Sequence, residues 1–423
     1  MERPILPLEL LDLTIEHFSN DRATLLAASL TCRSFHQICQ RILFTAYRLS
    51  TRKAEDDPLS PPQRLLRTLE TSQRLALCMH TLIVGDVSDK GNLTAQNRLF
   101  DECRRPLSLV YACAKNLKRL EINAPLSTRG WSAIPIQSGL HRHLGQILSI
   151  THLSLRNVHT VWLSWLSTFP KLEELCMERV SFTSNSRLER RFDAGSFPIS
   201  PKRIRLSLSQ RSLDQFLHWI CSNPNKFNLE SLEELSAAPD SRTYSIQSVT
   251  LYHLSRLPTK VHTTLQRLEC SLIGSLNAPS LNTNSCMDLS QLSNLRFIHI
   301  DYTVHAQWQS LLLPYEALAA FAGWLEGAKF CPNLKVMTIR LKTSPHLQAI
   351  PELATILEDI LVEFNIETIN LIFDDKYLEN PEAPHIVLEQ LKGQFPRLKN
   401  LERFNLTLAT PARKTQFPSY YDR

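Results

Sequence analysis

Residues 331–339 read CPNLKVMTI, and their apolar positions Leu334, Met337 and Ile339 form the spacing that decides the fold of this chain. The same pattern, apolar-x-x-apolar-x-apolar, recurs at intervals of roughly 22 to 39 residues, against the 20–29 of regular repeats of this kind. Full copies begin at Met79, Leu117, Ile150, Leu172, Leu265, Leu295, Leu334, Ile366 and Leu401, and degenerate copies lie at Ile204 and Leu232. We interpret each copy as one short β-strand.

Segments with helical spacing lie between the copies. We expect helices at Leu107–Ala114, Val161–Phe169, Leu213–Cys221, Tyr315–Phe330, Leu353–Phe364 and Ile386–Phe395. Strand–turn–helix units bury their apolar faces only by stacking on one another. The pattern therefore predicts a curved α/β solenoid with a parallel sheet on its concave face. The alternative is an ordinary α/β domain, whose strands show similar short apolar triplets.

The residues that alternate with the apolar positions are expected on the concave face. Their charges change sign from copy to copy, which suits a folded protein or peptide of mixed charge. The alternative is that they are solvated strand faces with no partner. The candidate target-binding residues are Arg119, Arg156, Glu174, Glu178, Arg203, Arg205, His299, Asp301, Arg340 and Lys342.

The N-terminus has a different pattern, with three short amphipathic segments between Leu6 and Phe44. Pro7 fits the first turn of a helix, where its missing N–H costs nothing. Three helices in about 40 residues bury too little surface to be stable alone. This lobe therefore needs a partner chain or the rest of its own chain.

The N-terminal sequence resembles the F-box, in the short F-box-like form found in fungal proteins. Leu6-Pro7-x-Glu9-Leu10 with Ile15 matches the opening of that motif, and Leu25-Leu26 followed by residues 29–35, SLTCRSF, matches its centre. Phe35 stands where the family usually has Trp, so the indole N–H contact to the partner is missing. The repeats behind it resemble the divergent leucine-rich-repeat domain that follows many F-boxes. The alternative is an ordinary helical cap on the first repeat.

This resemblance implies a substrate-recognition adaptor of a Skp1–cullin–F-box type ubiquitin ligase, which is not itself an enzyme. The lobe would bind a Skp1-type linker protein, and through it a cullin, while the repeats bind a target protein. The implied anchors for the linker are Leu6, Pro7, Leu8, Leu10, Ile15, Leu25, Leu26, Leu30, Cys32, Phe35 and Phe44. The alternative function is a stand-alone leucine-rich-repeat scaffold.

Composition agrees with an ordered protein that works without a cofactor or metal. The net charge is only +6 and no long Lys/Arg run occurs, so we do not expect nucleic acid as a partner. No apolar stretch approaches the ~20 residues of a membrane span, so we do not expect a membrane either. The ten cysteines form no CxxC pair, which favours reduced thiols in the cytoplasm or nucleus. Phosphate-loop, nucleophile-elbow and HExxH motifs are absent. His299, Asp301 and His305 could be drawn as a metal site, but they supply only three ligands and no fourth is in range.

The expected domain organisation follows from these segments. The F-box-like lobe spans residues 1–50, a linker and docking helix 51–74, the repeats 75–410, and a C-terminal tail 411–423. Prolines and charges between Thr51 and Pro62 indicate a linker or surface loop, and Gln63–Met79 again has helical spacing.

Overall fold

The computed structural model describes two compact units. The first comprises Met1–Pro201 and Asn225–Asn228, and the second comprises Lys202–Pro224 and Leu229–Arg423. The described residues are 8–19, 21–50, 59–85, 102–124, 131–132, 148–183, 198–239, 257, 259–274, 288–304, 315–343, 350–374 and 384–409. The expected C-terminal tail lies outside them.

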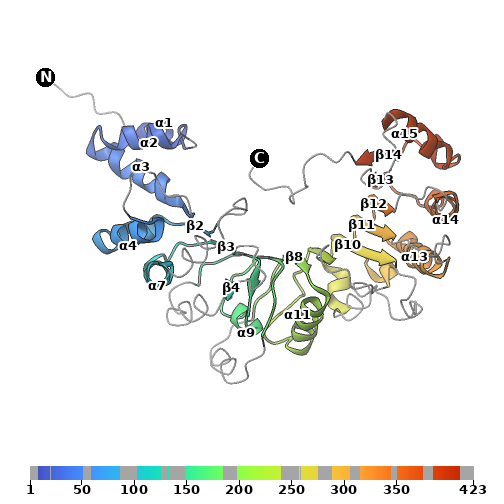
Figure 1. The fold of residues 1–423 in the computed structure, drawn as a ribbon, viewed down its shortest axis with the longest axis horizontal. Coiled ribbons are helices and arrows are strands. Elements are labelled where there is room, and N and C mark those ends of the chain that lie inside the picture. Colours follow the sequence, from blue (N-terminus) through green and yellow to red (C-terminus); the bar gives the residue numbers. More distant parts are fainter. Residues whose placement is uncertain are drawn as a thin grey trace. The chain divides into compact units, whose positions relative to one another are not determined.

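The first unit begins with a lobe of three helices, α1 (Leu8–Glu16), α2 (Arg22–Ser29) and α3 (Arg33–Thr45), coloured blue in Figure 1. Asp21 ends the turn before α2, and its carboxylate accepts the N–H of Thr24 at 3.0 Å, as an N-cap does. The buried core of the lobe consists of Ile15, Leu25, Ile38 and Cys39. Leu11, Ala28, Phe35, Ile42 and Leu43 pack against this small core.

The lobe runs directly into the sheet, because β1 (Ala46–Leu49) follows α3 without a loop and pairs with β2 (Thr81–Val84). The sequence pattern did not predict β1. Between these strands lie α4 (Pro61–Thr71) and α5 (Arg74–Cys78).

The last prolines of the expected linker or surface loop belong to a helix instead. Pro61 and Pro62 are buried and form the first turn of α4, where missing N–H groups leave nothing unpaired. The N–H of Ser60 donates to Oε1 of Gln63 at 3.1 Å, which is one bond of a capping box at the N-terminus of α4. A surface loop is therefore the wrong interpretation for residues 60–62, while residues 51–58 lie outside the described part.

The main sheet of the first unit has the strand order β1-β2-β3-β5-β7, all parallel. Its remaining strands are β3 (Arg119–Asn123), β5 (His152–Arg156) and β7 (Glu174–Glu178). In sequence, α7 (Arg104–Cys113) comes before β3, and α9 (Leu163–Leu166) comes between β5 and β7. A separate parallel pair joins β4 (Trp131–Ser132) to β6 (Val158–His159).

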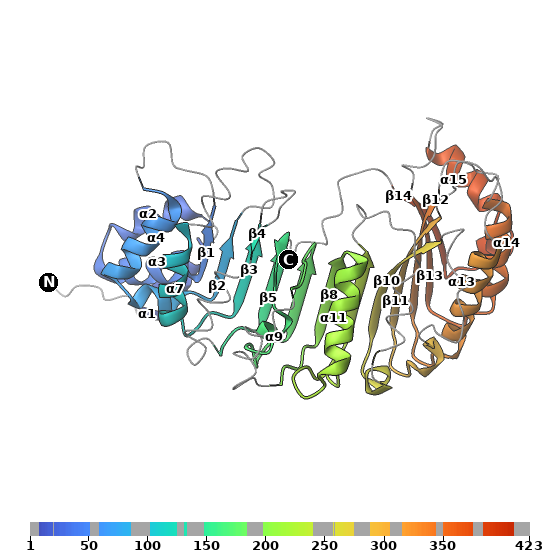
Figure 2. The ribbon, with the colours of Figure 1, turned by 60° about the horizontal axis from the view of Figure 1, so that its bottom comes forward.

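The sheet of the second unit has the order β8-β9-β10-β11-β12-β13-β14, again all parallel. The strands are β8 (Arg203–Leu208), β9 (Glu234–Pro239), β10 (Arg267–Gly274), β11 (Phe297–Val304), β12 (Val336–Thr343), β13 (Thr368–Asp374) and β14 (Phe404–Ala409). The helices are α11 (Gln210–Ser222), α13 (Tyr315–Gly327), α14 (Ile350–Val362) and α15 (Pro384–Gly393), with short 3-10 turns η1 (Thr259–Thr263), η3 (Leu289–Gln291), η4 (Ala328–Phe330) and η7 (Leu398–Asn400). Figure 2 shows α13 and α14 on one side of β10–β13.

All eleven copies of the apolar pattern form strands, which confirms an α/β fold with parallel strands. Their apolar positions are buried, as in Leu153 at 1% and Leu371 at 0% exposure. The last copy is looser, since Leu401 and Phe404 are half-buried and only Leu406 is buried.

A polar side chain just before each of several copies joins neighbouring repeats. Asn116 and Asn333 donate from Nδ2 to the backbone carbonyls of Leu77 (2.7 Å) and Ser293 (2.8 Å). Ser149 donates in the same way to the carbonyl of residue 117 at 2.8 Å. These bonds satisfy carbonyls in the turns that the strand ladder leaves unpaired.

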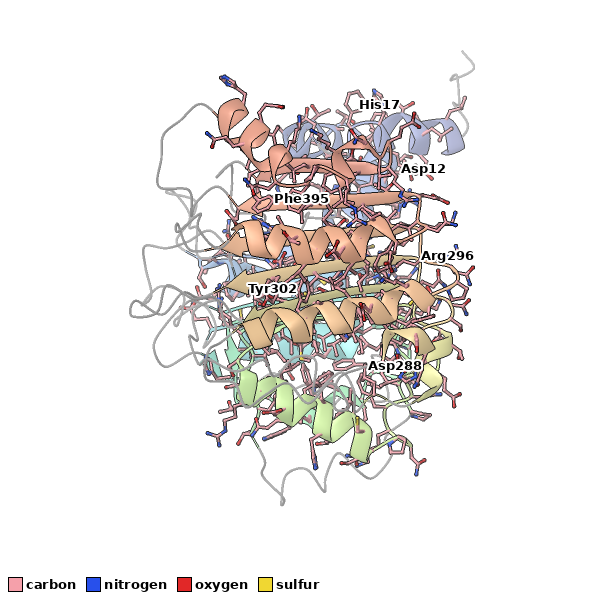
Figure 3. All side chains as sticks on the ribbon, turned by 90° about the vertical axis from the view of Figure 1, so that its right-hand side faces the viewer. Asp12, His17, Asp288, Arg296, Tyr302 and Phe395 are labelled. Carbon is pink, nitrogen blue, oxygen red and sulfur yellow. The ribbon has the colours of Figure 1, made fainter. Side chains whose placement is uncertain are left out.

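Aromatic side chains fill the space between sheet and helices in the second unit. Tyr302 of β11 stacks on Phe321 of α13, with ring centroids 4.3 Å apart, and burial raises the pKa of its phenol. Phe395 lies 6.3 Å from Phe373 and 6.1 Å from Phe404 (Figure 3). These contacts fix α13 and the segment after α15 against the strands.

A buried carboxylate on α14 holds the turn before β14. Oε1 of Glu358, whose residue is 6% exposed, accepts the N–H groups of Arg397 (2.5 Å) and Leu398 (3.0 Å). We predict that Glu358→Ala lowers the free energy of unfolding by about 2–4 kcal/mol, because two backbone donors lose their acceptor. Urea unfolding of the full chain measures this.

Asp359→Ala is the matched control. Asp359 is the next residue on α14 and pairs with the Arg397 guanidinium at 2.5 Å, but both side chains are more than half exposed. An exposed pair contributes about 0–1 kcal/mol. Equal losses for the two variants would contradict the role given to Glu358.

Candidate functional site

The lobe exposes five large apolar side chains, which we call the lobe patch. They are Leu10 (49% exposed), Leu13 (63%), Phe18 (39%), Leu26 (47%) and Leu30 (85%). Leu10 and Leu13 are three residues apart on α1, and Leu26 and Leu30 are four apart at the end of α2, so each pair lies on one side of its helix. Exposed apolar side chains paired in this way give each helix a candidate interaction surface.

The structure divides the expected linker anchors into two groups. Leu10, Leu26 and Leu30 belong to the lobe patch. Ile15 and Leu25 are 4% and 1% exposed and form the core of the lobe instead. In this arrangement these two side chains hold the helices together and do not face a partner.

The remaining expected anchors are less exposed or not described. Phe35 is half-buried and packs against the lobe core, and Phe44 stacks on Tyr47 with centroids 5.7 Å apart. Cys32 is exposed, but its Sγ accepts the N–H of Phe35 at 3.5 Å and so caps α3. Leu6 and Pro7 lie outside the described residues, and Leu8 begins α1 with its side chain undescribed.

Neither Leu13 nor Phe18 is among the anchors expected from the sequence. The available signal was that α1 is apolar on more than one side, since Leu11 packs against the core while Leu13 points away. A helix of a monomeric lobe has one apolar stripe. The additional apolar residues are those that face outward.

Charged residues lie close to the lobe patch in sequence. Arg41 of α3 reaches Asp12 (3.0 Å) and Glu16 (3.5 Å) of α1, which ties these two helices together. Arg22 and Arg33, the first residues of α2 and α3, are exposed. The two arginines place positive charge beside Leu26 and Leu30 in sequence.

The division between core and patch leads to a prediction on stability. We expect Leu30→Asp to leave the melting temperature of the full chain unchanged within error, because Leu30 is 85% exposed. Leu25→Asp, at 1% exposure, should destabilise the lobe by about 3 kcal/mol or more, because it buries an unpaired carboxylate. Thermal unfolding followed by circular dichroism compares the two variants, and equal effects would contradict the packing described.

A second candidate surface is the helix-free face, formed by the strand residues that alternate with the buried ones. In the first unit, pairs along and across strands join Arg119 to Glu121 (2.6 Å), His152 to Glu174 (3.1 Å) and Arg156 to Glu178 (3.4 Å). These side chains are half-buried.

The same pairing occurs in the second unit. The contacts are Arg205 to Glu234 (3.8 Å), Arg267 to Glu269 (2.6 Å), His299 to Asp301 (3.1 Å) and Arg340 to Asp374 (3.0 Å). Burial raises the pKa of Glu269, but hydrogen bonds from Arg267 and Ser236 and nearby positive charge outweigh it, and the net pKa is lowered. Glu269 is therefore held ionised.

These contacts change the interpretation of the alternating charges on the strands. The residues expected to offer charge to a target are largely bonded to one another, so they are neither fully solvated nor free to capture an ion. Arg203 is half-buried on β8, and Lys342 lies in β12 with its side chain undescribed. Arg340 and Arg267 each already have an acidic partner, so the net charge that they offer to a ligand is reduced.

The helix-free face of the second unit also has uncharged and apolar members. Phe297 is 40% exposed, which is unusual for a large aromatic side chain on a strand. Thr338, Asn370 and Asn405 lie side by side on β12, β13 and β14. Phe, like Tyr and Trp, is enriched at protein–protein interfaces.

Metal-ligating side chains do not gather among the described residues. No group of three or more His, Cys, Asp or Glu side chains in that part could hold a metal, and His305 lies outside it. Described cysteines are free thiols, and burial raises the pKa of Cys331 to about 12, so that thiol stays protonated at neutral pH. Of the helices that the structure describes, none is long and apolar enough to cross a membrane.

The two surfaces are thus defined by their own geometry: an apolar patch on the lobe, and strand faces whose charges are mostly self-paired. Comparison with known proteins found no family model that matches this chain and no curated protein that matches its sequence.

Proposed function

We propose that this protein is a substrate-recognition adaptor of a Skp1–cullin–F-box type ubiquitin ligase, acting in the cytoplasm or nucleus. The observation that carries the proposal is the lobe patch. The three-helix lobe has its own small core, and yet it keeps five large apolar side chains in solvent. A lobe that served only to cap the first repeat would have no use for this exposure.

The exposed apolar area makes a sizeable contribution to binding. Fully burying an exposed large aliphatic or aromatic side chain contributes about 1.5–3 kcal/mol, and the exposed parts of the five amount to roughly three whole side chains, so covering them contributes about 4–8 kcal/mol before the costs of association. Those costs are about 4–15 kcal/mol. A linker protein would therefore need to cover the whole patch and add polar contacts at its rim to bind firmly.

Two exposed arginines of the lobe would suit an acidic partner. Arg22 and Arg33 begin α2 and α3, close to Leu26 and Leu30 in sequence. Complementary charge raises association rates and excludes wrong partners. This is the chemistry that a Skp1-type linker offers, according to the F-box resemblance of residues 6–35.

The repeats supply the second half of an adaptor. Parallel strands with intervening helices agree with a leucine-rich-repeat solenoid, and the helix-free face leaves side chains such as Phe297 open to a target. The adaptor contributes no catalytic group. It raises the effective concentration of the target near the ubiquitin-transfer machinery.

Linker capture provides the first test. We predict that the double variant Leu26→Asp, Leu30→Asp loses a co-expressed Skp1-type linker in a pull-down while it remains folded, because both side chains are exposed. Leu77→Asp is the matched control, since Leu77 is also exposed (43%) but lies on α5. If the double variant retains the linker at the wild-type level, the adaptor role is wrong.

Target capture provides the second test. We predict that Phe297→Ala reduces target recovery at least fivefold in affinity purification but leaves the linker bound, because loss of one buried aromatic contact costs about 1–2 kcal/mol or more. The Leu26→Asp, Leu30→Asp variant should show the reverse. Quantitative mass spectrometry of both purifications separates the two surfaces, and loss of both partners in either variant would show that they are not independent.

The stand-alone scaffold remains the second candidate function. It shares the target-binding repeats and differs only in the lobe. A scaffold predicts that the target is captured normally while no linker co-purifies with the wild-type chain.

A further inference from the structure

The helix-free face of β12–β14 holds an uninterrupted row of uncharged hydrogen-bonding side chains. Thr338, Asn370 and Asn405 are aligned in register on three neighbouring strands. Nδ2 of Asn405 donates to Oδ1 of Asn370 at 3.2 Å, and Nδ2 of Asn370 donates to Oγ1 of Thr338 at 3.2 Å. The three side chains therefore orient one another.

This row keeps hydrogen-bonding capacity after its internal bonds are made. A carboxamide has two N–H donors and two acceptor lone pairs. In the row, Asn370 uses one N–H and one lone pair, and Asn405, which is exposed, uses one N–H. The remaining N–H and C=O match the C=O and N–H of a peptide unit.

The charges around the row select against a charged ligand. Arg340 is bonded to Asp374 (3.0 Å), and His299 to Asp301 (3.1 Å). The opposite charges within such a pair largely cancel, so a phosphate or carboxylate gains little net attraction here. Charge complementarity therefore favours a ligand segment without net charge.

An apolar contact lies at one end of the row. Phe297 of β11, 40% exposed, is in register with the half-buried Val336 of β12. It lies two residues before His299, which is the register partner of Thr338. An apolar side chain of a ligand that lies on the row would contact this ring.

We infer that the face of β11–β14 binds an extended, uncharged peptide segment of the target, which crosses the strands with its main chain on Asn370 and Asn405 and one apolar side chain on Phe297. This inference rests on the proposed function, because it specifies the class of target. Neighbouring strands are about 4.8 Å apart, so three steps span about 14 Å, and an extended peptide at about 3.3 Å per residue covers this with about four residues.

Panning a phage library of random 12-residue peptides on the full chain tests the inference. We expect enriched peptides to have a net charge near zero and a large apolar residue. A synthetic fluorescein-labelled peptide of that sequence should bind Asn370→Ala, Asn405→Ala at least tenfold more weakly, measured by fluorescence anisotropy. Phe297→Ala should weaken binding by a similar factor.

Glu402→Gln is the matched control, since Glu402 is exposed just before β14 and should leave the affinity unchanged. If the double variant loses its melting transition, Asn405→Ala alone, at an exposed site, takes its place. The inference is overturned if strongly charged peptides are enriched, if a phosphoserine version binds more tightly, if the asparagine variants bind as well as wild type, or if panning enriches nothing.

The outcome is separable from that of the adaptor proposal. The selected peptide should bind the Leu26→Asp, Leu30→Asp variant with wild-type affinity. If the wild-type chain captures no linker but still binds the peptide through Asn370 and Asn405, the adaptor role falls and the peptide site stands. If the wild-type chain captures the linker but binds no peptide, the peptide site falls and the adaptor role stands.

Discussion

Each strand completes its backbone hydrogen bonds only by pairing with the strands of neighbouring repeats, and its apolar side chains are buried only when the repeats are stacked. The rest of the structure depends on this requirement. The strand β13 shows this, since it pairs with β12 on one side and β14 on the other, and Leu371 is completely buried. Side chains such as Asn333 extend the same dependence into the turns. No single repeat is stable alone, so stability is shared along the stack, and a surface made from several strands is correspondingly rigid.

This dependence gives the two faces of each sheet different tasks. One face is closed by helices and aromatic contacts such as Tyr302 on Phe321. The other face is open, and its ion pairs, including Arg340 with Asp374, hold the side chains in place before a ligand arrives. Preordered side chains lose less entropy on binding. The same pairs reduce the charge that the face can offer, which leaves Phe297 and the asparagine row as its most available groups.

In the lobe, by contrast, part of the apolar surface stays exposed. Its core of four residues already uses the apolar side chains that point inward, and α1 and α2 carry more apolar residues than that core can cover. Leu30 remains in solvent because its helix ends there and no described element of the chain packs on it. Such a surface is a cost for a free protein and an advantage for a subunit. That contrast is the physical basis of the adaptor proposal.

The sequence by itself determined the strand positions, because a strand in a stacked sheet repeats one local pattern of buried side chains, as residues 331–339 do. It also determined that a small helical lobe comes first. Only the tertiary structure decided that Ile15 and Leu25 are core while Leu13 and Leu30 face outward, because both groups share the same helical spacing. It alone decided that Pro61 and Pro62 start a helix, and that Arg340 pairs with Asp374, 34 residues away. Pairings of this kind depend on strand register, and register is a property of neighbouring repeats that no local stretch contains.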